Sequence, residues 1–445
     1  MSKLKPYPKY KDSGVAWIGE VPEGWENRKI SRSFMTIGSG TTPKSDKSQF
    51  YDEGTIPWVT TSELREAIIS HTVNSVTEQA LNEYSALKIY PSGTLLIAMY
   101  GATIGRIGIL AINATCNQAC CALANGITLE IPFVYHWFQS FKTILQTLAS
   151  GGGQPNLSQE FIREIRISAP ECPEQQTIAA YLDRKTAQID ALIAKKTRSI
   201  ELLREKRQTM ITHAVTKGLN PNAKMKDSGI EWIGDVPEGW DVQALKHISN
   251  AITVGIVVNP SEYISEDGLP FIYGGDIKEG EIDFINSRKI SLCDSELNKK
   301  TQLYYGDILT VRVGYPGVTS VVPKECEGGN CASVMHIRRG MFNSYWLSYA
   351  MNSRVIKFQI EVVKYGAAQE QFNISHAVEF LIPSPPLSEQ QAIVAFLDNY
   401  CGKLNTLITK TERSIELLKE KRQALITAAV TGKIDVREAA PEVIC

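Results

Sequence analysis

The sequence predicts an α/β (α+β) protein made of two similar globular domains separated by a long antiparallel two-helix coiled coil, with a pseudo-two-fold internal repeat at an offset of 215 residues. Three observations predict this architecture. A segment near the N-terminus returns almost unchanged in mid-chain, two long stretches free of proline and almost free of glycine carry one apolar stripe each, and the segments between them have the pattern of short strands and turns. The 445 residues leave room for two to four domains.

Composition places the chain among ordinary globular proteins and excludes intrinsic disorder and collagen-like architectures, since 43% of residues are hydrophobic and 21% charged. The 47 Lys and Arg residues balance 48 Asp and Glu residues, so any nucleic-acid surface must be local. A signal-peptide core and an apolar run of about 18 residues are both missing, which predicts a cytoplasmic protein without membrane contact. The nine cysteines lack metal-site spacing, so we expect reduced packing residues and no metal site.

The repeat is the strongest signal in the sequence. Residues 9–26 (KYKDSGVAWIGEVPEGWE) return at 224–241 (KMKDSGIEWIGDVPEGWD) with 13 of 18 positions identical. At the same offset, 197–208 (TRSIELLREKRQ) matches 412–423 (ERSIELLKEKRQ) at ten of twelve positions. The segments between these matches share only sparse landmarks. We therefore predict two copies of one unit, each with a variable domain followed by a fixed segment.

The fixed segments have the pattern of long helices. Apolar residues step by alternating four and three positions in both copies, which is typical of a coiled-coil seam. A proline precedes each run and a glycine, Gly218 or Gly432, follows it. Two helices of about 43 residues, each about 65 Å long, are expected. The residues expected to pair them are Leu182, Ile189, Ile193, Ile200, Leu203, Leu397, Leu404, Ile408, Ile415 and Leu418.

A helix of this length with a single apolar stripe needs a partner, and the matching partner in the chain is its own duplicate. The connection of some 170 residues allows either direction, whereas the pseudo-two-fold relation favours antiparallel pairing with the variable domains at opposite ends. A structural helix pair without any spacing role remains an alternative. The expected segments are 1–26, 27–172, 173–217, 218–241, 242–387, 388–432 and a tail at 433–445.

Short apolar runs bounded by glycine in the variable domains predict strands at residues 54–59, 93–99, 107–111, 269–273, 307–313 and 318–322. A late helix is expected in each domain, at 134–149 and 345–363.

Polar loops between these elements have side chains suited to base edges and phosphates. Such loops are usually only turns. Two variable domains on one scaffold, each suited to reading a different target, make DNA contacts more plausible for these loops taken together. The candidate DNA-binding residues are Ser39, Thr41, Thr42, Lys44, Lys47, Tyr100, Thr103, Arg106, Gln154, Asn156, Arg312, Tyr315, Lys364, Tyr365, Gln369, Gln371 and Asn373.

The sequence lacks the motifs of several catalytic classes. It has no phosphate-cradling GxxxxGK[ST] loop, no dinucleotide fingerprint, no amino-methyltransferase segment and no E-x-K triplet of the common metal-dependent nuclease core. The six histidines are scattered. We therefore expect a binding subunit with no catalytic residues, which determines where enzymes on other chains act.

The residues resemble the specificity subunit of type I restriction-modification systems. The resemblance rests on the duplicated DSGxxWIGxVPEGW motif (Asp12 to Trp25 and Asp227 to Trp240), the Glu-Gln-x-x-Ile entry to each long helix (Glu174 to Ile178 and Glu389 to Ile393), the SIELLxEKRQ seam, and a Gly-x-x-Gln-x-x-x-Ser loop. It covers nearly the whole chain. The variable domains match only at landmarks, as is usual for target recognition domains.

This resemblance implies a non-catalytic chain that reads a bipartite, non-palindromic target in double-stranded DNA, with the helix pair setting the unspecified gap. Its partners would be two methyltransferase subunits, which bind S-adenosylmethionine and methylate adenine N6, and two restriction subunits that translocate and cut DNA with ATP and magnesium. This chain would bind none of these cofactors.

Two further features leave the interpretation open. The first long helix has nine basic against five acidic residues, which could track DNA, although a solvated face or a docking site for the modification subunits (Arg198, Lys206 and Arg207) explains the excess equally well. The alternative functions are a coiled-coil adaptor that binds two proteins without reading DNA, and a free-standing methyltransferase or nuclease, which the missing motifs disfavour.

Overall fold

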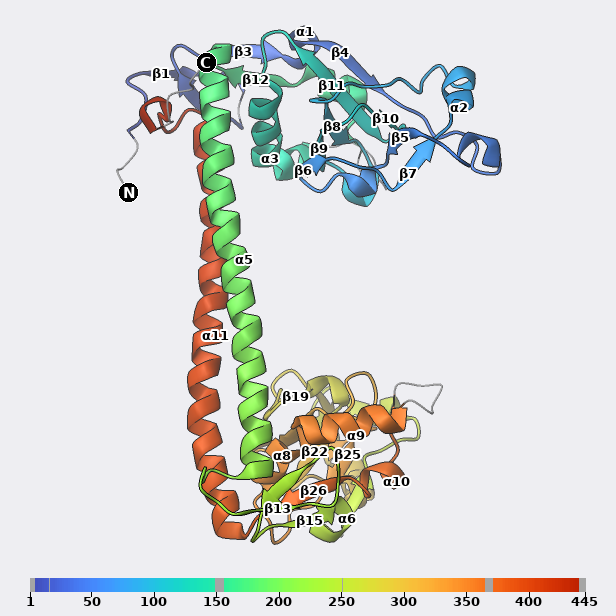
Figure 1. Cartoon of the computed structure of the whole chain (residues 1–445), viewed down its shortest axis with the longest axis vertical. Helices are drawn as coiled ribbons and strands as arrows, with labels where there is room; N and C mark the ends of the chain where they lie inside the picture. The colour runs from blue at the N-terminus through green and yellow to red at the C-terminus, as the bar shows by residue number, and fades with distance from the viewer. Residues whose placement is uncertain (1–4, 16, 149–155, 250, 365–370, 440–445) are drawn as a thin grey trace. The chain divides into compact units, whose positions relative to one another are not determined.

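A computed structural model describes residues 5–15, 17–148, 156–249, 251–364 and 371–439. The chain divides into two compact units (Figure 1). The first unit comprises residues 1–195 and 413–445, and the second comprises residues 196–412. Each unit contains part of the long helix α5 (Cys172–Lys217) and part of the long helix α11 (Leu387–Val430).

The first unit contains a mixed β-structure covered by α3 (Ile131–Leu148). Its main sheet has the order β4-β11-β8-β9-β6, and only the β6–β9 pair is parallel. A smaller sheet has the order β10-β5-β7. The strand bounds are β4 (Phe34–Ser39), β5 (Ile56–Val59), β6 (Ala67–Ile69), β7 (Asn74–Val76), β8 (Leu95–Ala98), β9 (Ile107–Leu110), β10 (Thr115–Cys116) and β11 (Cys120–Gly126).

Shorter elements tie this sheet to the long helices. Strand β3 pairs with β12, which directly precedes α5, and β1 pairs with β2 in the repeated motif. One core joins Trp25, Phe133 and Trp137 to Leu182 of α5 and Ile426 of α11. The bounds are β1 (Tyr10–Asp12), β2 (Glu20–Pro22), β3 (Glu26–Lys29), α1 (Ile30–Ser33), α2 (Glu78–Glu83), α4 (Gln159–Glu164) and β12 (Arg166–Ala169).

The second unit has a similar arrangement, with four strands in its main sheet where the first unit has five. Its main sheet has the order β16-β25-β22-β23, and a second sheet has the order β17-β21-β18-β24, in which only the β18–β24 pair is parallel. The strand bounds are β13 (Met225–Asp227), β14 (Asp235–Pro237), β15 (Asp241–Ala244), β16 (Ile252–Val254), β17 (Ile264–Ser265), β18 (Leu269–Ile272), β19 (Ile277–Lys278), β20 (Glu281–Ile282), β21 (Arg288–Ile290), β22 (Ile308–Thr310), β23 (Thr319–Val321), β24 (Asn330–Cys331), β25 (Met335–Ile337) and β26 (Leu381–Ser384).

The late helical segment expected at 345–363 is helical in the structure but is divided into two helices. The structure has α8 (Ser344–Met351) and α9 (Arg354–Lys364), beside the short helices α6 (Leu245–Ile248), α7 (Leu292–Leu297) and α10 (Ile374–Ala377). Asn352 lies at the break, where its side-chain amide accepts a hydrogen bond from the Thr319 N–H (3.0 Å) and donates one to the Thr319 carbonyl (2.8 Å). These bonds tie the break to β23. Asn352 also donates to the Ser348 carbonyl four residues earlier (2.9 Å), and local side-chain bonds of this kind compete with helix continuation.

The long helices pair in antiparallel fashion, as predicted (Figure 1). In the first unit, Arg422 donates to the Asp190 carboxylate at 2.9 and 3.2 Å. In the second unit, Arg204 donates to Glu412 and Arg207 to Asn405, at 2.9 and 3.1 Å. As the residue number rises along α5 it falls along α11, which defines the antiparallel direction. Both helices end one or two residues before a glycine with positive φ, Gly218 (74°) and Gly432 (68°).

The residues predicted to pair the helices are largely withdrawn from solvent. Six are buried and four are half-buried, whereas most intervening positions are exposed. The buried ones are Leu182, Ile200, Leu397, Leu404, Ile408 and Ile415, and the half-buried ones are Ile189, Ile193, Leu203 and Leu418. Within the described ranges, none of the helices is both long and apolar enough to cross a membrane. The eight cysteines in those ranges are free thiols.

We predict that Ile408→Asp destabilises the helix pair by about 3–5 kcal/mol, because Ile408 is 8% exposed and the substitution leaves a buried charge without a partner. The neighbouring Leu407 is 50% exposed, so Leu407→Asp is the matched control and should change stability little. Thermal and urea unfolding followed by circular dichroism measure both. Equal stability of the two variants would contradict the assignment of the seam.

Candidate nucleic-acid interface

In the first unit, the predicted loop after β4 begins at a glycine that no other residue can replace. A Cβ at Gly40 would lie 1.5 Å from the Cys116 carbonyl oxygen in β10. The loop is then held by the Trp58 indole N–H, which donates to the Thr41 carbonyl (3.2 Å), and by Thr42, whose hydroxyl donates to the Gln118 amide oxygen (2.6 Å). This close approach sets the direction in which the loop leaves the sheet.

Two further predicted loops of the first unit meet beside this one. Tyr100, after β8, forms an isolated antiparallel bridge with Asn156, and the Leu157 N–H donates to the Met99 carbonyl (2.7 Å). From α4, Gln159 and Arg163 both donate to the Ile37 carbonyl near the end of β4, at 3.3 and 3.0 Å. The polar loops after β4, after β8 and before α4 therefore lie together.

The second unit brings its own two predicted loops together in the same way. Val313, after β22, bridges Gln371, and the Arg312 Nε donates to the Phe372 carbonyl at 3.3 Å. Burial lowers the pKa of the Arg312 guanidinium from its ordinary value, although it remains a cation at neutral pH. Gly255 is the counterpart of Gly40, since its Cβ would lie 2.3 Å from the Cys331 carbonyl oxygen. Both Gly40 and Gly255 lie 76 residues before the cysteine that they contact.

The predicted DNA-binding residues differ in exposure. Thr42, Lys44, Lys47, Asn156, Tyr315 and Asn373 are exposed, and Tyr315 has 82% of its surface accessible. A second group is half-buried: Ser39, Thr41, Tyr100, Thr103, Arg106, Arg312 and Gln371. Gln154, Tyr365, Gln369 and the side chain of Lys364 lie outside the described residues. The exposed polar groups of the first set are accessible to a macromolecule.

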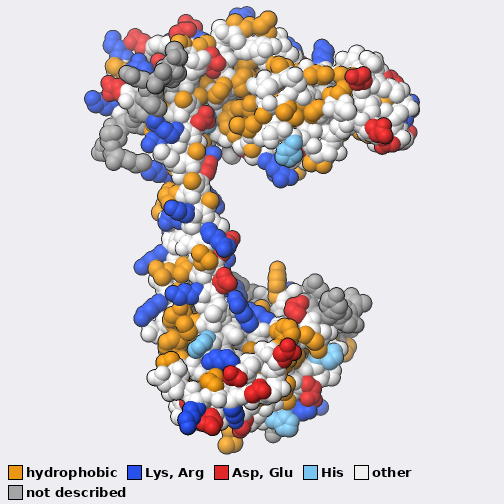
Figure 2. Space-filling view, viewed as in Figure 1, with side chains coloured by type: hydrophobic (Ala, Val, Ile, Leu, Met, Phe, Trp, Pro, Cys, Tyr) orange, Lys and Arg blue, Asp and Glu red, His pale blue; other side chains and the backbone are white. Residues whose placement is uncertain are grey.

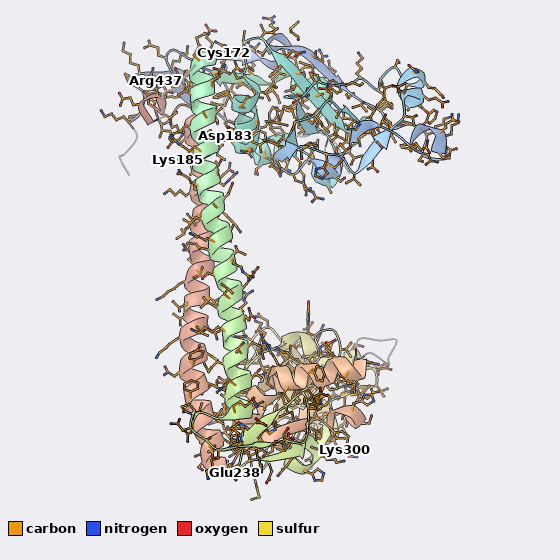
Figure 3. All side chains as sticks on the ribbon, in the orientation of Figure 1. Cys172, Asp183, Lys185, Glu238, Lys300 and Arg437 are labelled. Atoms are coloured by element: carbon orange, nitrogen blue, oxygen red, sulfur yellow. The ribbon has the colours of Figure 1, made fainter. Side chains whose placement is uncertain are left out.

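Sequence analysis missed several residues at these edges. Gln118 lies beside Thr42, and Val257 and Val258, 58% and 78% exposed, line a hollow of about 520 Å³ together with Lys299 and Lys300. Lys300 is labelled in Figure 3. The matched Gly–Cys pairs at an offset of 215 are the sequence signal that could have pointed to the loops starting at Gly40 and Gly255.

The basic residues of α5 are partly engaged inside the protein. Figure 2 shows Lys and Arg side chains along the helix pair. Arg204 is paired with Glu412, and Arg207 is 25% exposed and paired with Glu279 at 2.7 Å. The guanidinium of Arg207, one of the residues suggested for docking, is held between the hairpin at Glu279 and Asn405 of α11, so contacts within the chain also account for its charge.

Matched hydrogen bonds seat α3 of the first unit on both long helices and α8 of the second unit on α11. In the first unit, Gln175 accepts from the Glu130 N–H (2.8 Å), and Asp183, labelled in Figure 3, lies 2.8 Å from His136 Nε2. Thr427 of α11 accepts from Ser140 at 2.8 Å. The second unit repeats the first two contacts between Gln390 and the Asn343 N–H (2.8 Å) and between Asp398 and the Tyr349 hydroxyl (2.7 Å).

One charged contact breaks this symmetry. Arg207 and Arg422 are counterparts, but Arg422 faces Asp190 on the other helix whereas Arg207 faces the uncharged Asn405. Arg207 pairs instead with Glu279, which also accepts from Lys357 at 2.8 Å. The β19–β20 hairpin of the second unit is therefore tied to α5 by an ion pair for which the structure gives no counterpart in the described residues of the first unit.

A buried histidine supports the strand pair that leads to the Arg312 loop. His336 Nε2 lies 2.8 Å from an Asp307 oxygen, and Arg338 donates to the same oxygen at 2.9 Å. Burial lowers the pKa of His336 despite the opposing effect of the carboxylate. His336 Nδ1 is buried without a hydrogen-bond partner, which fits a neutral ring, because a proton there would have no acceptor. The pKa of Asp307 is lowered, since hydrogen bonds to the carboxylate outweigh its burial.

We predict that stability falls as pH drops below about 6.5, the ordinary pKa of histidine. The pKa of His336 is lower in the folded protein than in the unfolded chain, so between the two pKa values the unfolded chain binds the proton and the folded protein does not. The free energy of unfolding is therefore highest above about pH 6.5 and falls as the pH approaches the folded pKa. The slope is at most about 1.4 kcal/mol per pH unit for one proton. Urea unfolding from pH 7.5 to 5 should show a shallower dependence for His336→Gln and an unchanged one for the exposed control His247→Gln. Equal slopes in all three proteins would contradict this account.

The described residues contain no cluster of three or more His, Cys, Asp or Glu side chains arranged to hold a metal ion.

The family model described as "Type I restriction modification DNA specificity domain" matches twice, over residues 22–202 and 237–417.

The similar proteins span about two thirds or more of the chain. The chain is 26% identical over 440 residues to the type I restriction enzyme MjaIX specificity subunit of Methanocaldococcus jannaschii, covering 95% of this chain and 96% of that protein. It is 25% identical over 316 residues to the EcoBI specificity subunit of Escherichia coli, covering 68% of this chain and 65% of that protein.

Two solved structures that share the fold are also similar to the chain. One, from work on assembly and conformational transition of the type I R-M system, has a TM-score of 0.72 at 18% identity over 93% of this chain and 99% of that one. The HsdS subunit from Thermoanaerobacter tengcongensis has a TM-score of 0.53 at 19% identity over 93% and 98%.

Proposed function

The chain belongs to the type I restriction-modification DNA specificity family, as a specificity subunit with two recognition domains, and from that premise we propose that each domain reads one half of a bipartite, non-palindromic DNA target. A specificity subunit is not the catalytic component of a type I enzyme. The proposed recognition domains are residues 27–172 and 242–387, and base contacts come from the polar loops in the major groove.

One observation carries this proposal. The same two loops meet in both units, through the Tyr100–Asn156 bridge in one and the Val313–Gln371 bridge in the other. The backbone arrangement is duplicated, but the exposed side chains differ: Lys44 and Lys47 lie near one edge, whereas Val257, Val258 and Tyr315 lie near the other. A duplicated backbone platform with unlike side chains is what reading two different half-sites requires.

We propose that the chain directs two methyltransferase subunits, which use S-adenosylmethionine to methylate adenine N6, and two restriction subunits, which use ATP and magnesium. Matched exposed leucines support two equal docking surfaces: Leu192 and Leu417 belong to the first unit, and Leu407 and Leu202 are their counterparts in the second. Exposed apolar residues that recur at equivalent positions suit two copies of one partner.

Exchange of residues 27–172 for the same region of a relative with a different target tests the proposal. Only one half of the methylated sequence should change, because the other domain is untouched. Genome-wide mapping of methylated adenines, with the unaltered chain as control, measures this. An unchanged target, or a change in both halves, would refute reading by separate domains.

Single substitutions in the two bridges should act on opposite halves of the target. We expect Asn156→Ala and Gln371→Ala each to reduce discrimination in one half-site by about 1–3 kcal/mol, the contribution of a good side-chain contact to a base. Binding to duplexes with single base changes measures this. Asn220→Ala, in the exposed connection after α5, is the control and should leave both halves unaffected. Reduced discrimination in both half-sites of either variant would count against the assignment of one bridge to each half-site.

A further inference from the structure

The second unit contains a cavity of about 300 Å³ where its sheet meets the long helices. Its walls include Gly280 from the β19–β20 hairpin, Ser348 and Tyr349 from α8, Arg207 from α5 and Asp398 from α11. An apolar cavity of about half this volume is enough to hold a benzene molecule. The cavity is therefore large enough for a small ring and has polar groups on its walls.

The internal repeat shows what fills this space in the first unit. Equivalent contacts align α3 of the first unit with α8 of the second, both before and after the position of Ser348. Glu130 and Asn343 bond the helix glutamines, and His136 and Tyr349 bond the helix aspartates. Both pairs are 213 residues apart, so the counterpart of Ser348 is Tyr135.

The opposite wall is matched in the same way. Glu66 (φ 52°) donates its N–H to the Ile107 carbonyl at 2.9 Å, and Gly280 (φ 79°) donates its own to the Thr319 carbonyl at 3.2 Å. The two acceptors occupy the same position on β9 and β23, opposite Ile97 of β8 and Thr310 of β22. Gly280 is thus the structural counterpart of Glu66.

In the first unit, the phenol ring of Tyr135 spans this space. Its hydroxyl donates to the Glu66 carbonyl at 2.5 Å. Burial raises the pKa of Tyr135 to about 12, and the nearby Arg422, the counterpart of Arg207, opposes the rise. In the second unit, Ser348 has no ring to fill the space. Gly280, the counterpart of Glu66, lines the cavity. Arg207 Nε is buried without a hydrogen-bond partner.

We propose that this cavity binds a small phenol, a planar six-membered ring with one hydroxyl group, in the place that Tyr135 occupies in the first unit. The hydroxyl donates to the Gly280 carbonyl. The bound ring contacts groups from α8, from the hairpin and from both long helices, and so holds α8 and the hairpin against the helix pair. This site is separate from the loops proposed to read DNA.

Binding of p-cresol, the side chain of tyrosine, to the purified full-length chain tests the proposal by saturation-transfer NMR and calorimetry. The unaltered chain should bind one p-cresol with a rise in melting temperature. Ser348→Tyr should bind none and should melt at a higher temperature without ligand, because its own ring fills the space. The non-planar control cyclohexanol should bind more weakly than p-cresol.

Tyr135→Ser is the reciprocal variant, since it opens the corresponding space in the first unit. It should bind two p-cresol molecules and melt at a lower temperature. The Ser348→Tyr result decides the question even where Tyr135→Ser fails to fold. Absence of binding to the unaltered chain, or unchanged binding to Ser348→Tyr, would overturn the proposal.

Discussion

The antiparallel pairing of α5 with α11 is the interaction on which the rest of the structure depends. A single apolar stripe on so long a helix is stable only against a matching stripe, and the duplicated seam supplies one. Pairing in this direction also brings the start of α5 beside the end of α11 in the first unit, and the reverse in the second. Both helices therefore contribute to each core, with Leu182 and Ile426 in one and Ile211 and Leu397 in the other.

Much of this architecture was predictable from the sequence because its signals are periodic or local. The offset of 215 residues revealed two copies, the alternating steps of four and three revealed the seam, and glycine-bounded apolar runs marked β5, β8, β9, β18, β22 and β23. The break between α8 and α9 was not predictable, because it depends on a bond between Asn352 and Thr319, which are 33 residues apart. The pairing of Arg207 with Glu279, across 72 residues, was equally hidden.

The candidate interface was predicted only as separate polar loops. Their meeting depends on single backbone bridges, Tyr100 with Asn156 and Val313 with Gln371, that have no sequence signature. The glycines that aim the first loop of each unit are visible in the sequence, but the carbonyl oxygens that exclude a side chain there are not. Duplication then allows divergence. The ladders, the seating contacts and the seam are kept in both copies, while the exposed edges and the space at Tyr135 and Ser348 have changed.

In the proposed function, two equivalent edges contact different parts of one DNA target. Site-specific photo-crosslinking tests it most directly, with a benzophenone amino acid placed at position 156 or 371 and a duplex containing the methylated target. Each position should crosslink to one half of the target, and the two positions should label opposite halves. Crosslinks from both positions to the same half, or equal labelling of a duplex without the target, would contradict it.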